Sequence, residues 1–142
     1  MTGSINHVEL LKRRCRVLYN YALSALENGD YDIAVFICEQ AAQLCLKATL
    51  LRILGFIPRG HGLRELLGVL SKSLEKLGKL EYSREVSRFT EDFRDDLWLL
   101  EDAYISARYL VKIYEREDAV RSISVIEKLF KLLEVIERDV FS

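Results

Sequence analysis

Proline is almost absent from this chain, and this absence is the feature that most limits how it can fold. Pro58 is the only proline, and the seven glycines stand in a few places. Because proline and glycine are the residues that most often interrupt helices, long uninterrupted segments remain. None of them shows the alternation of apolar and polar residues that is typical of a half-buried strand. The sequence therefore predicts an all-α protein.

Apolar residues recur every three or four positions in these segments, as they do in helices with one buried face. The first predicted helix covers about residues 6–28, and Asn28-Gly29-Asp30 forms the turn after it. In the second, residues 31–54, apolar residues cover more than one face, so we expect it at the centre of the fold. Further helices are predicted at 63–77, 84–108 (interrupted, if at all, near 94–96) and 117–140. Together they predict a single domain, 1–142, folded as a five-helix antiparallel up-and-down bundle with short loops.

Length and composition indicate that this domain needs neither disulfides nor a metal for stability. It has 142 residues, 50% of them hydrophobic, and 21 basic residues nearly balance 22 acidic ones. A domain of this size buries roughly two thirds of the surface of its unfolded chain, and the small net charge excludes intrinsic disorder. Three cysteines without a Cys-x-x-Cys pair are expected to be core residues: Cys15, Cys38 and Cys45. We find neither a membrane-spanning run nor a signal peptide, and expect a cytoplasmic protein without membrane contact or cofactor.

Charge is unevenly distributed along the chain. Residues 47–88 contain nine Lys or Arg against four Glu, whereas residues 89–104 contain six acidic residues and one Arg. One interpretation is a basic surface for phosphates beside an acidic surface for a cation or a basic partner. The other is ordinary solvated helix faces that are paired within the fold. Both interpretations remain open at this point.

Like charges stack within the acidic segment. Glu91 and Asp95 lie one helical turn apart, as do Asp92 and Asp96, and each such pair costs roughly 0.2–0.5 kcal/mol unless a positive charge lies nearby. Glu101 and Asp102 add to the same negative region. Neighbouring arginines, Arg88 and Arg94, are simpler partners than a magnesium ion, so we expect no metal site.

Motifs for common catalytic sites are absent. The sequence contains no phosphate-binding Gly-x-x-x-x-Gly-Lys-Ser/Thr loop, no His-Glu-x-x-His helix and no Gly-x-Ser-x-Gly elbow. Of its two histidines, His7 lies near a terminus, whereas His61 follows Arg59 between two glycines that would let a phosphate approach the backbone. A structural alternative for His61 is to cap the third helix or to pack on the second.

A second polar cluster lies near the end of the fourth predicted helix. Tyr104 and Arg108 share a helical face at positions i and i+4, and Tyr109 follows. A guanidinium beside phenol rings can bind a phosphate through two hydrogen bonds or stack on a base. The alternative is a salt bridge between helices. We expect the 55–63 and 104–109 segments to lie close enough to share an anion.

The order and spacing of several short motifs resemble the HEPN family (higher eukaryotes and prokaryotes nucleotide-binding), over nearly the whole chain. No single motif is specific; the match rests on the set. Its members are Gly29-Asp30-Tyr31-Asp32-Ile33-Ala34, Glu39-Gln40-Ala41-Ala42, Lys47-Ala48, Gly55-Phe56-Ile57-Pro58-Arg59-Gly60-His61-Gly62-Leu63 with Leu66-Leu67, and Tyr104 with Ala107-Arg108-Tyr109.

The resemblance implies a homodimeric five-helix bundle, often encoded with a minimal nucleotidyltransferase and acting in toxin–antitoxin or defence systems. Many members are metal-independent ribonucleases whose active site is an Arg separated from a His by four to six residues. That motif, an Arg followed by a His, is missing, because one residue separates Arg59 from His61, eight separate Arg52 from His61, and no basic residue precedes His7. Leu110 also stands where many relatives have a proline. Nucleotide or RNA binding without catalysis is then implied for Arg108, Tyr104, Tyr109, His61, Arg59 and Lys47.

Two other functions compete with this prediction. The first is a ribonuclease with a rearranged active site, such as Arg108 acting with His61. The second is a protein-interaction scaffold of the tetratricopeptide type, since residues 25–34 look like the turn of such a repeat. The spacing is not repeated at a period near 34 residues, however, and stacked repeats need about three copies for stability.

Overall fold

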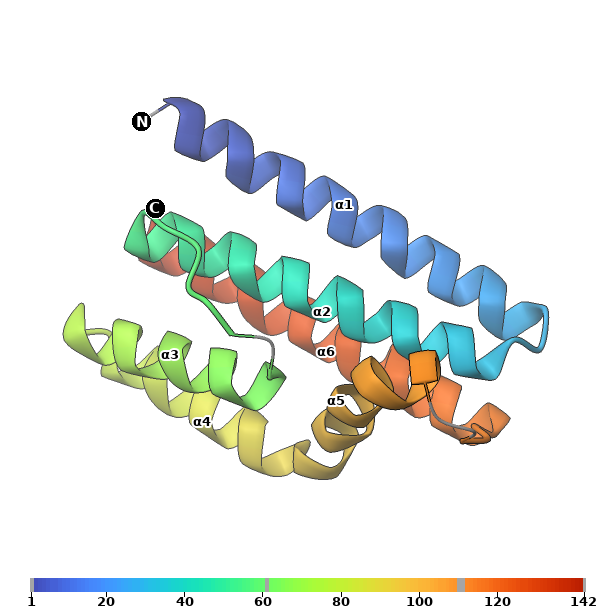
Figure 1. The fold of residues 1–142 in the computed structure, drawn as a ribbon. Coiled ribbons are helices and arrows are strands. Elements are labelled where there is room, and N and C mark those ends of the chain that lie inside the picture. Colours follow the sequence, from blue (N-terminus) through green and yellow to red (C-terminus); the bar gives the residue numbers. More distant parts are fainter. Residues whose placement is uncertain (1, 61, 110–111, 142) are drawn as a thin grey trace.

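The computed structural model describes residues 2–60, 62–109 and 112–141, and every regular element in them is a helix. The fold class predicted from the sequence is therefore confirmed, but the described residues form six helices and not five. Figure 1 shows α1, α2 and α6 as three long neighbouring helices, with α3 and α4 as a shorter hairpin beside them. The six helices are α1 (Thr2–Glu27), α2 (Tyr31–Leu54), α3 (Leu63–Lys76), α4 (Leu80–Asp92), α5 (Arg94–Tyr109) and α6 (Arg116–Val140).

The additional helix comes from the segment expected as a single helix over 84–108. α4 begins earlier, at Leu80, shortly after the turn at Gly78. It ends at Asp92 and is followed by Phe93, where φ is −111° and ψ is 25°. α4 packs mainly on α3, whereas α5 packs mainly on α2, so the chain must change direction between them. Apolar residues continue at helical spacing on both sides of Phe93. For this reason the sequence pattern did not require an interruption, and it placed the interruption near 94–96, slightly after its observed position.

Helix α2 lies at the centre of the bundle, as its apolar residues on several faces predicted. It packs against α1, α3, α5 and α6. By length and composition alone α2 could also cross a membrane, but most of that stretch is buried inside the bundle. The apolar character of α2 is therefore explained by its neighbours. Its fully buried residues include Ala34, Val35, Cys38, Leu46 and Leu50.

The turn between α1 and α2 forms where it was expected. Gly29 adopts a positive φ of 81°, and Asp30 N donates to Ala25 O over 2.9 Å, which closes the end of α1. Helices of 26 and 24 residues meet at this turn, whereas the α3–α4 hairpin has helices of 14 and 13 residues. The two hairpins are thus not copies of one repeat, which argues against a tetratricopeptide-like array.

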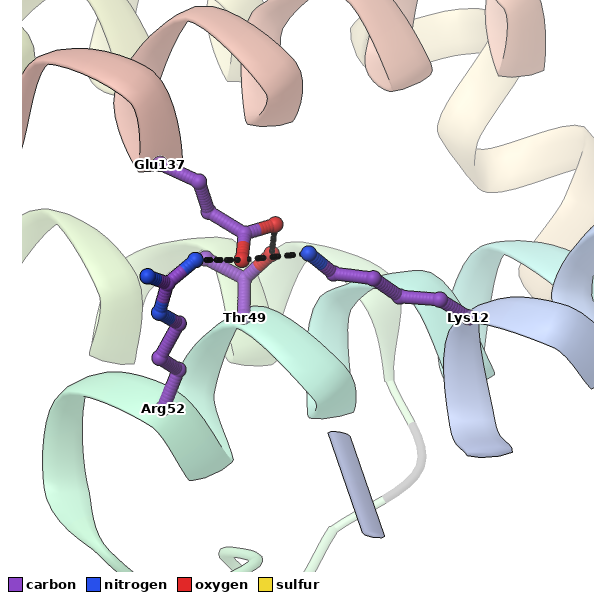
Figure 2. A network of polar contacts seen from close by, with 4 residues as sticks. All are labelled: Lys12, Thr49, Arg52 and Glu137. Atoms are coloured by element: carbon purple, nitrogen blue, oxygen red, sulfur yellow. Dashed lines mark hydrogen bonds and ion pairs between the residues drawn. The ribbon is translucent and has the colours of Figure 1, made fainter. Parts of the chain in front are cut away.

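A carboxylate at the C-terminal end of α6 ties three helices together (Figure 2). The Glu137 side chain is only 10% exposed, and its oxygens lie 2.7 Å from Lys12 Nζ of α1 and 3.3 Å from Arg52 Nη1 of α2. Thr49 Oγ1 donates a further hydrogen bond over 3.1 Å. The Arg52 guanidinium lies 4.2 Å above the centre of the Phe141 ring. Because a buried carboxylate needs such partners, this network fixes α1 and α6 on α2.

The three cysteines behave as the sequence predicted. Cys15 and Cys38 are buried and Cys45 is half-buried. Burial raises the pKa of the Cys38 thiol to about 12. The pKa of Cys45 is raised as well, chiefly by its hydrogen bond with Cys15. Protonated thiols are poor nucleophiles, so Cys38 and Cys45 serve the core, as does the buried Cys15.

Candidate functional site

The N-terminal end of α3 and the middle of α5 enclose an open hollow of about 410 Å³. This volume falls in the range of small-molecule sites, which is about 300–1,000 Å³. Gly62 and Tyr104 lie in its wall together, so the 55–63 and 104–109 segments do meet there. The remaining lining residues are Arg64, Trp98, Glu101, Asp102 and Ile105.

An ion pair with two contacts joins the two sides of this hollow. Arg64 Nε donates to Glu101 Oε2 over 2.7 Å, and Arg64 Nη2 lies 3.4 Å from Glu101 Oε1. The hydrogen bond to Glu101 raises the pKa of Arg64 above its ordinary value, so the guanidinium stays charged. Glycine at position 62 keeps the neighbouring space open, because a Cβ there would lie 3.6 Å from Glu101 Oε1.

The loop that leads into α3 depends on its glycines. Gly55 ends α2 with φ of 83°, and its N–H donates to Leu51 O over 2.8 Å. Gly60 has φ of 124°, and a Cβ there would lie 2.7 Å from Glu65 Oε1. Both backbone conformations are unfavourable for residues with a side chain. Glycine at positions 55 and 60 therefore allows the backbone conformations through which the loop reaches the start of α3.

Three of the six carboxylates in the acidic segment are paired with cations from other parts of the chain. Arg121 of α6 binds Asp96 through Nη2 at 2.5 Å and through Nε at 2.8 Å. Lys112 binds Asp102, and this bond raises the pKa of Lys112. With Arg64 on Glu101, three carboxylates thus have partners that differ from the expected Arg88 and Arg94. The expectation of a nearby positive charge is confirmed, but the choice of arginines was wrong.

A second hollow, of about 420 Å³, lies beside the first, and Trp98 lines both. Lys112 lines the second hollow, and its Nζ lies 5.3 Å from the centre of the Trp98 ring and 5.3 Å from that of Tyr114. Trp98 is 52% exposed, which is unusual for so large an apolar side chain. The indole is therefore a wall between two open spaces and contributes little to the core.

The residues predicted from the sequence are only partly brought together. Tyr104 lines the first hollow, but among the described lining residues there is neither Lys47, which is half-buried on α2, nor Arg59, which is exposed in the loop. Tyr109 is 75% exposed near the end of α5. His61 and the side chain of Arg108 lie outside the described part of the structure.

Five residues that line this hollow were not among the site residues predicted from the sequence: Arg64, Trp98, Glu101, Asp102 and Ile105. A signal for Trp98 was available, because Leu97, Leu100 and Tyr104 define the inner stripe of α5 and Trp98 falls off it. A tryptophan off the buried stripe is expected to be exposed, and tryptophan is enriched at interfaces. No local signal pairs Arg64 with Glu101, which are 37 residues apart in the sequence.

Besides Glu137, a second buried carboxylate was not predicted from the sequence. The carboxylate of Glu39 on α2 is fully buried and accepts hydrogen bonds from Gln40 Nε2 at 2.7 Å and Gln43 Nε2 at 2.6 Å. These amides offset the loss of hydration of the carboxylate.

Among the described residues, no group of three or more His, Cys, Asp or Glu side chains is arranged to hold a metal ion.

Comparisons with known proteins agree with this architecture. A family model described as "HEPN domain" matches residues 8–136. The crystal structure of TT1696 from Thermus thermophilus has a similar fold, with a TM-score of 0.67 over 91% of this chain and 97% of that chain. At 24% sequence identity, that likeness concerns the fold. A comparison with curated proteins found no match.

Proposed function

This chain belongs to the HEPN domain family, and on that premise we propose that it is a nucleotide- or RNA-binding module that does not cleave its ligand. The observation that carries the proposal is the hollow in which Gly62, Arg64 and Tyr104 meet. It combines aromatic rings with polar groups in an open space, which is how proteins recognise unstacked bases. The phosphates are then bound outside it by cations, for which we propose Arg108 and Arg59, of which Arg59 is exposed in the loop before α3.

The absence of catalysis is proposed on chemical grounds. Cleavage by the usual family mechanism needs an Arg followed by a His after four to six residues, and the sequence has no such pair in that order, since no basic residue precedes His7. His7, the only histidine besides His61, is exposed on the first turns of α1. A general acid or base must reach the reacting atoms, and neither histidine has the expected arginine at the right spacing.

Binding is tested with a labelled single-stranded RNA at about 50 and about 200 mM salt by fluorescence anisotropy. We expect affinity to fall with increasing salt, because phosphate contacts release counterions. Arg59→Ala and Arg108→Ala should each weaken binding several-fold, whereas Arg84→Ala, which removes an exposed arginine of α4, serves as the matched control. If no RNA binds at the lower salt concentration, the proposal fails.

The same preparations separate binding from cleavage. We expect an RNA ladder to remain intact during long incubation at high protein concentration. Cleavage that persists in a chelator and disappears in Arg108→Ala would instead establish the alternative function, a metal-independent endoribonuclease.

We further propose that the module acts as a homodimer. Two of the most exposed large apolar side chains, Tyr109 at 75% and Ile113 at 79%, lie close in sequence at the end of α5 and just after it. Apolar side chains that are this exposed favour burial against another molecule. Light scattering should show a dimer for the wild type and a monomer for the double variant Tyr109→Ser, Ile113→Ser. A monomeric wild type at all concentrations would refute this part.

The cellular setting that we propose is cytoplasmic, with a nucleotidyltransferase as partner in a toxin–antitoxin or defence-type system. Family membership supports it. Purification of the tagged chain from its native host, followed by mass spectrometry, should recover a nucleotidyltransferase. Recovery of the chain alone under gentle conditions would argue against this partner.

A further inference from the structure

Trp98 is the only tryptophan of the chain, and it separates two hollows on the surface of α5. The ring is half exposed, and Lys112 covers part of it from the side of the second hollow. A flat aromatic surface in the wall of the first hollow is suited to stacking on another planar ring.

The charges around the first hollow are balanced. Arg64 binds Glu101, and Lys112 binds Asp102, so two cations neutralise two carboxylates. A phosphate entering the hollow would meet the carboxylates, and an ammonium group would meet carboxylates that already have partners. A neutral planar group avoids both conflicts. The charge balance therefore favours a nucleobase inside the hollow over a charged ligand.

The polar groups of the wall also select among the bases. Glu101 Oε2 has a close partner in Arg64 at 2.7 Å, but the contact of Oε1 with the same arginine is long, at 3.4 Å. Gly62 has no side chain to cover Oε1. A carboxylate has about four acceptor positions, so Glu101 can accept further hydrogen bonds from the side of the hollow.

Guanine is the base whose hydrogen-bonding edge fits a carboxylate. Its N1–H and N2–H groups are adjacent donors that point the same way. Adenine and cytosine place a ring acceptor beside their amino group, and uracil places carbonyl acceptors on both sides of its N–H. Those acceptors would face the carboxylate oxygens and repel them.

We propose that this hollow binds a guanine base of single-stranded RNA, stacked on Trp98 and donating N1–H and N2–H to the carboxylate of Glu101. Arg64 acts as a positioning residue, because its two contacts hold that carboxylate in place. The inference rests on the proposed RNA-binding function and adds base specificity to it.

The test uses short oligouridines with a single central guanosine or a single central adenosine. Since Trp98 is the sole tryptophan, quenching of its fluorescence reports contact at the hollow directly. We expect the guanosine oligomer to quench Trp98 and to bind about tenfold more tightly than the adenosine oligomer, as one base-specific interaction commonly provides.

Variants locate the effect. Trp98→Ala and Glu101→Gln should each remove the preference for guanosine. Gly62→Val should reduce it by covering Glu101 Oε1, and this substitution is compatible with the extended backbone at Gly62, where φ is −70° and ψ is 127°. Tyr21→Ala and Glu91→Gln, which alter an exposed aromatic residue of α1 and an exposed glutamate of α4, should leave the preference unchanged.

The outcomes distinguish this inference from the function on which it rests. If both oligomers bind equally and neither quenches Trp98, the guanine site is wrong while RNA binding stands. If neither oligomer binds at low salt, the proposed function fails together with the site. A guanosine preference that survives in folded Trp98→Ala, Glu101→Gln and Gly62→Val would place the base elsewhere and overturn the inference.

Discussion

Arg64 Nε lies 2.7 Å from Glu101 Oε2, and this ion pair connects the start of α3 with the middle of α5. The two helices otherwise share a small interface, since α3 packs mainly on α4 and α5 mainly on α2. This single contact, between Arg64 at the start of α3 and Glu101 of α5, therefore gives the candidate site its shape. Its effect on the fold as a whole should be small, whereas its effect on the site should be large.

Arg64→Gln tests whether the ion pair shapes the site while contributing little to the stability of the fold. The pair is partly exposed, and exposed ion pairs contribute about 0.2–1 kcal/mol to stability, so the free energy of unfolding should change by less than about 1 kcal/mol. Amide hydrogen exchange over residues 98–105 should become faster, because Glu101 loses its anchor. Arg84→Gln on α4 provides the control. Unchanged exchange in Arg64→Gln would show that α5 does not depend on the pair.

The Glu137 network should matter more for stability. Glu137→Gln keeps the size of the side chain but removes the charge that Lys12 and Arg52 bind (Figure 2). Hydrogen bonds to charged groups contribute about 1.5–3 kcal/mol, and we expect a loss in that range in urea unfolding. Glu134→Gln, an exposed position one turn earlier on α6, should change stability by no more than about 0.5 kcal/mol. Equal effects of the two variants would contradict the structural role of Glu137.

Two glycines should respond to alanine in opposite directions. Gly55 needs its positive φ of 83° at the end of α2, so Gly55→Ala should cost about 1–2 kcal/mol. Gly68 lies within α3, where alanine is the better helix former, so Gly68→Ala should stabilise the protein by about 0.5–1 kcal/mol. A Cβ at either position meets nothing within 4 Å, so crowding does not complicate the comparison. Thermal and urea unfolding of both variants would measure the difference.

Stability should decrease at alkaline pH in part because of Cys38. Burial raises the pKa of this thiol from 9.0 to about 12, so in the folded state it keeps its proton where the unfolded state has lost it. The free energy of unfolding that the protonated Cys38 thiol contributes is fully present below about pH 9. It is lost as pH rises toward about 12, by at most about 1.4 kcal/mol per pH unit.

Urea unfolding in the presence of reductant, at a series of pH values from about 8 to about 11, would measure this contribution. Tyrosines also titrate in this range, and most do so in the wild type and in Cys38→Ala alike; the exception is Tyr19, whose raised pKa depends in small part on the charge of Cys38. The difference between the two slopes of stability against pH therefore reports the Cys38 thiol together with its effect on Tyr19, and we expect the wild type to have the steeper fall. Parallel slopes would refute the prediction.

Much of the fold follows from local sequence. Glycines with positive φ form the turn after α1, the end of α2 and the turn after α3; these are Gly29, Gly55 and Gly78. Between them, apolar residues recur at helical spacing. Such signals lie within a few residues of the feature that they predict, so they can be read without knowing the rest of the molecule. The division of residues 80–109 into α4 and α5 is different, because it arises from packing on two different helices.

The candidate site shows the same contrast. The need of the acidic segment for positive partners was inferred from like charges spaced as if one helical turn apart, although the break at Phe93 puts Glu91 and Asp92 on α4 and Asp95 and Asp96 on α5. Which partners it finds depends on the faces that meet in three dimensions: Arg64, Lys112 and Arg121 come from α3, from the segment after α5 and from α6. Amino-acid order alone was enough for the helices, because a helix is stabilised between residues about four positions apart. The ion pairs and hollows of the site required the packed bundle, because residues as far apart in the sequence as Arg64 and Glu101, 37 positions, come together only when distant apolar faces are buried.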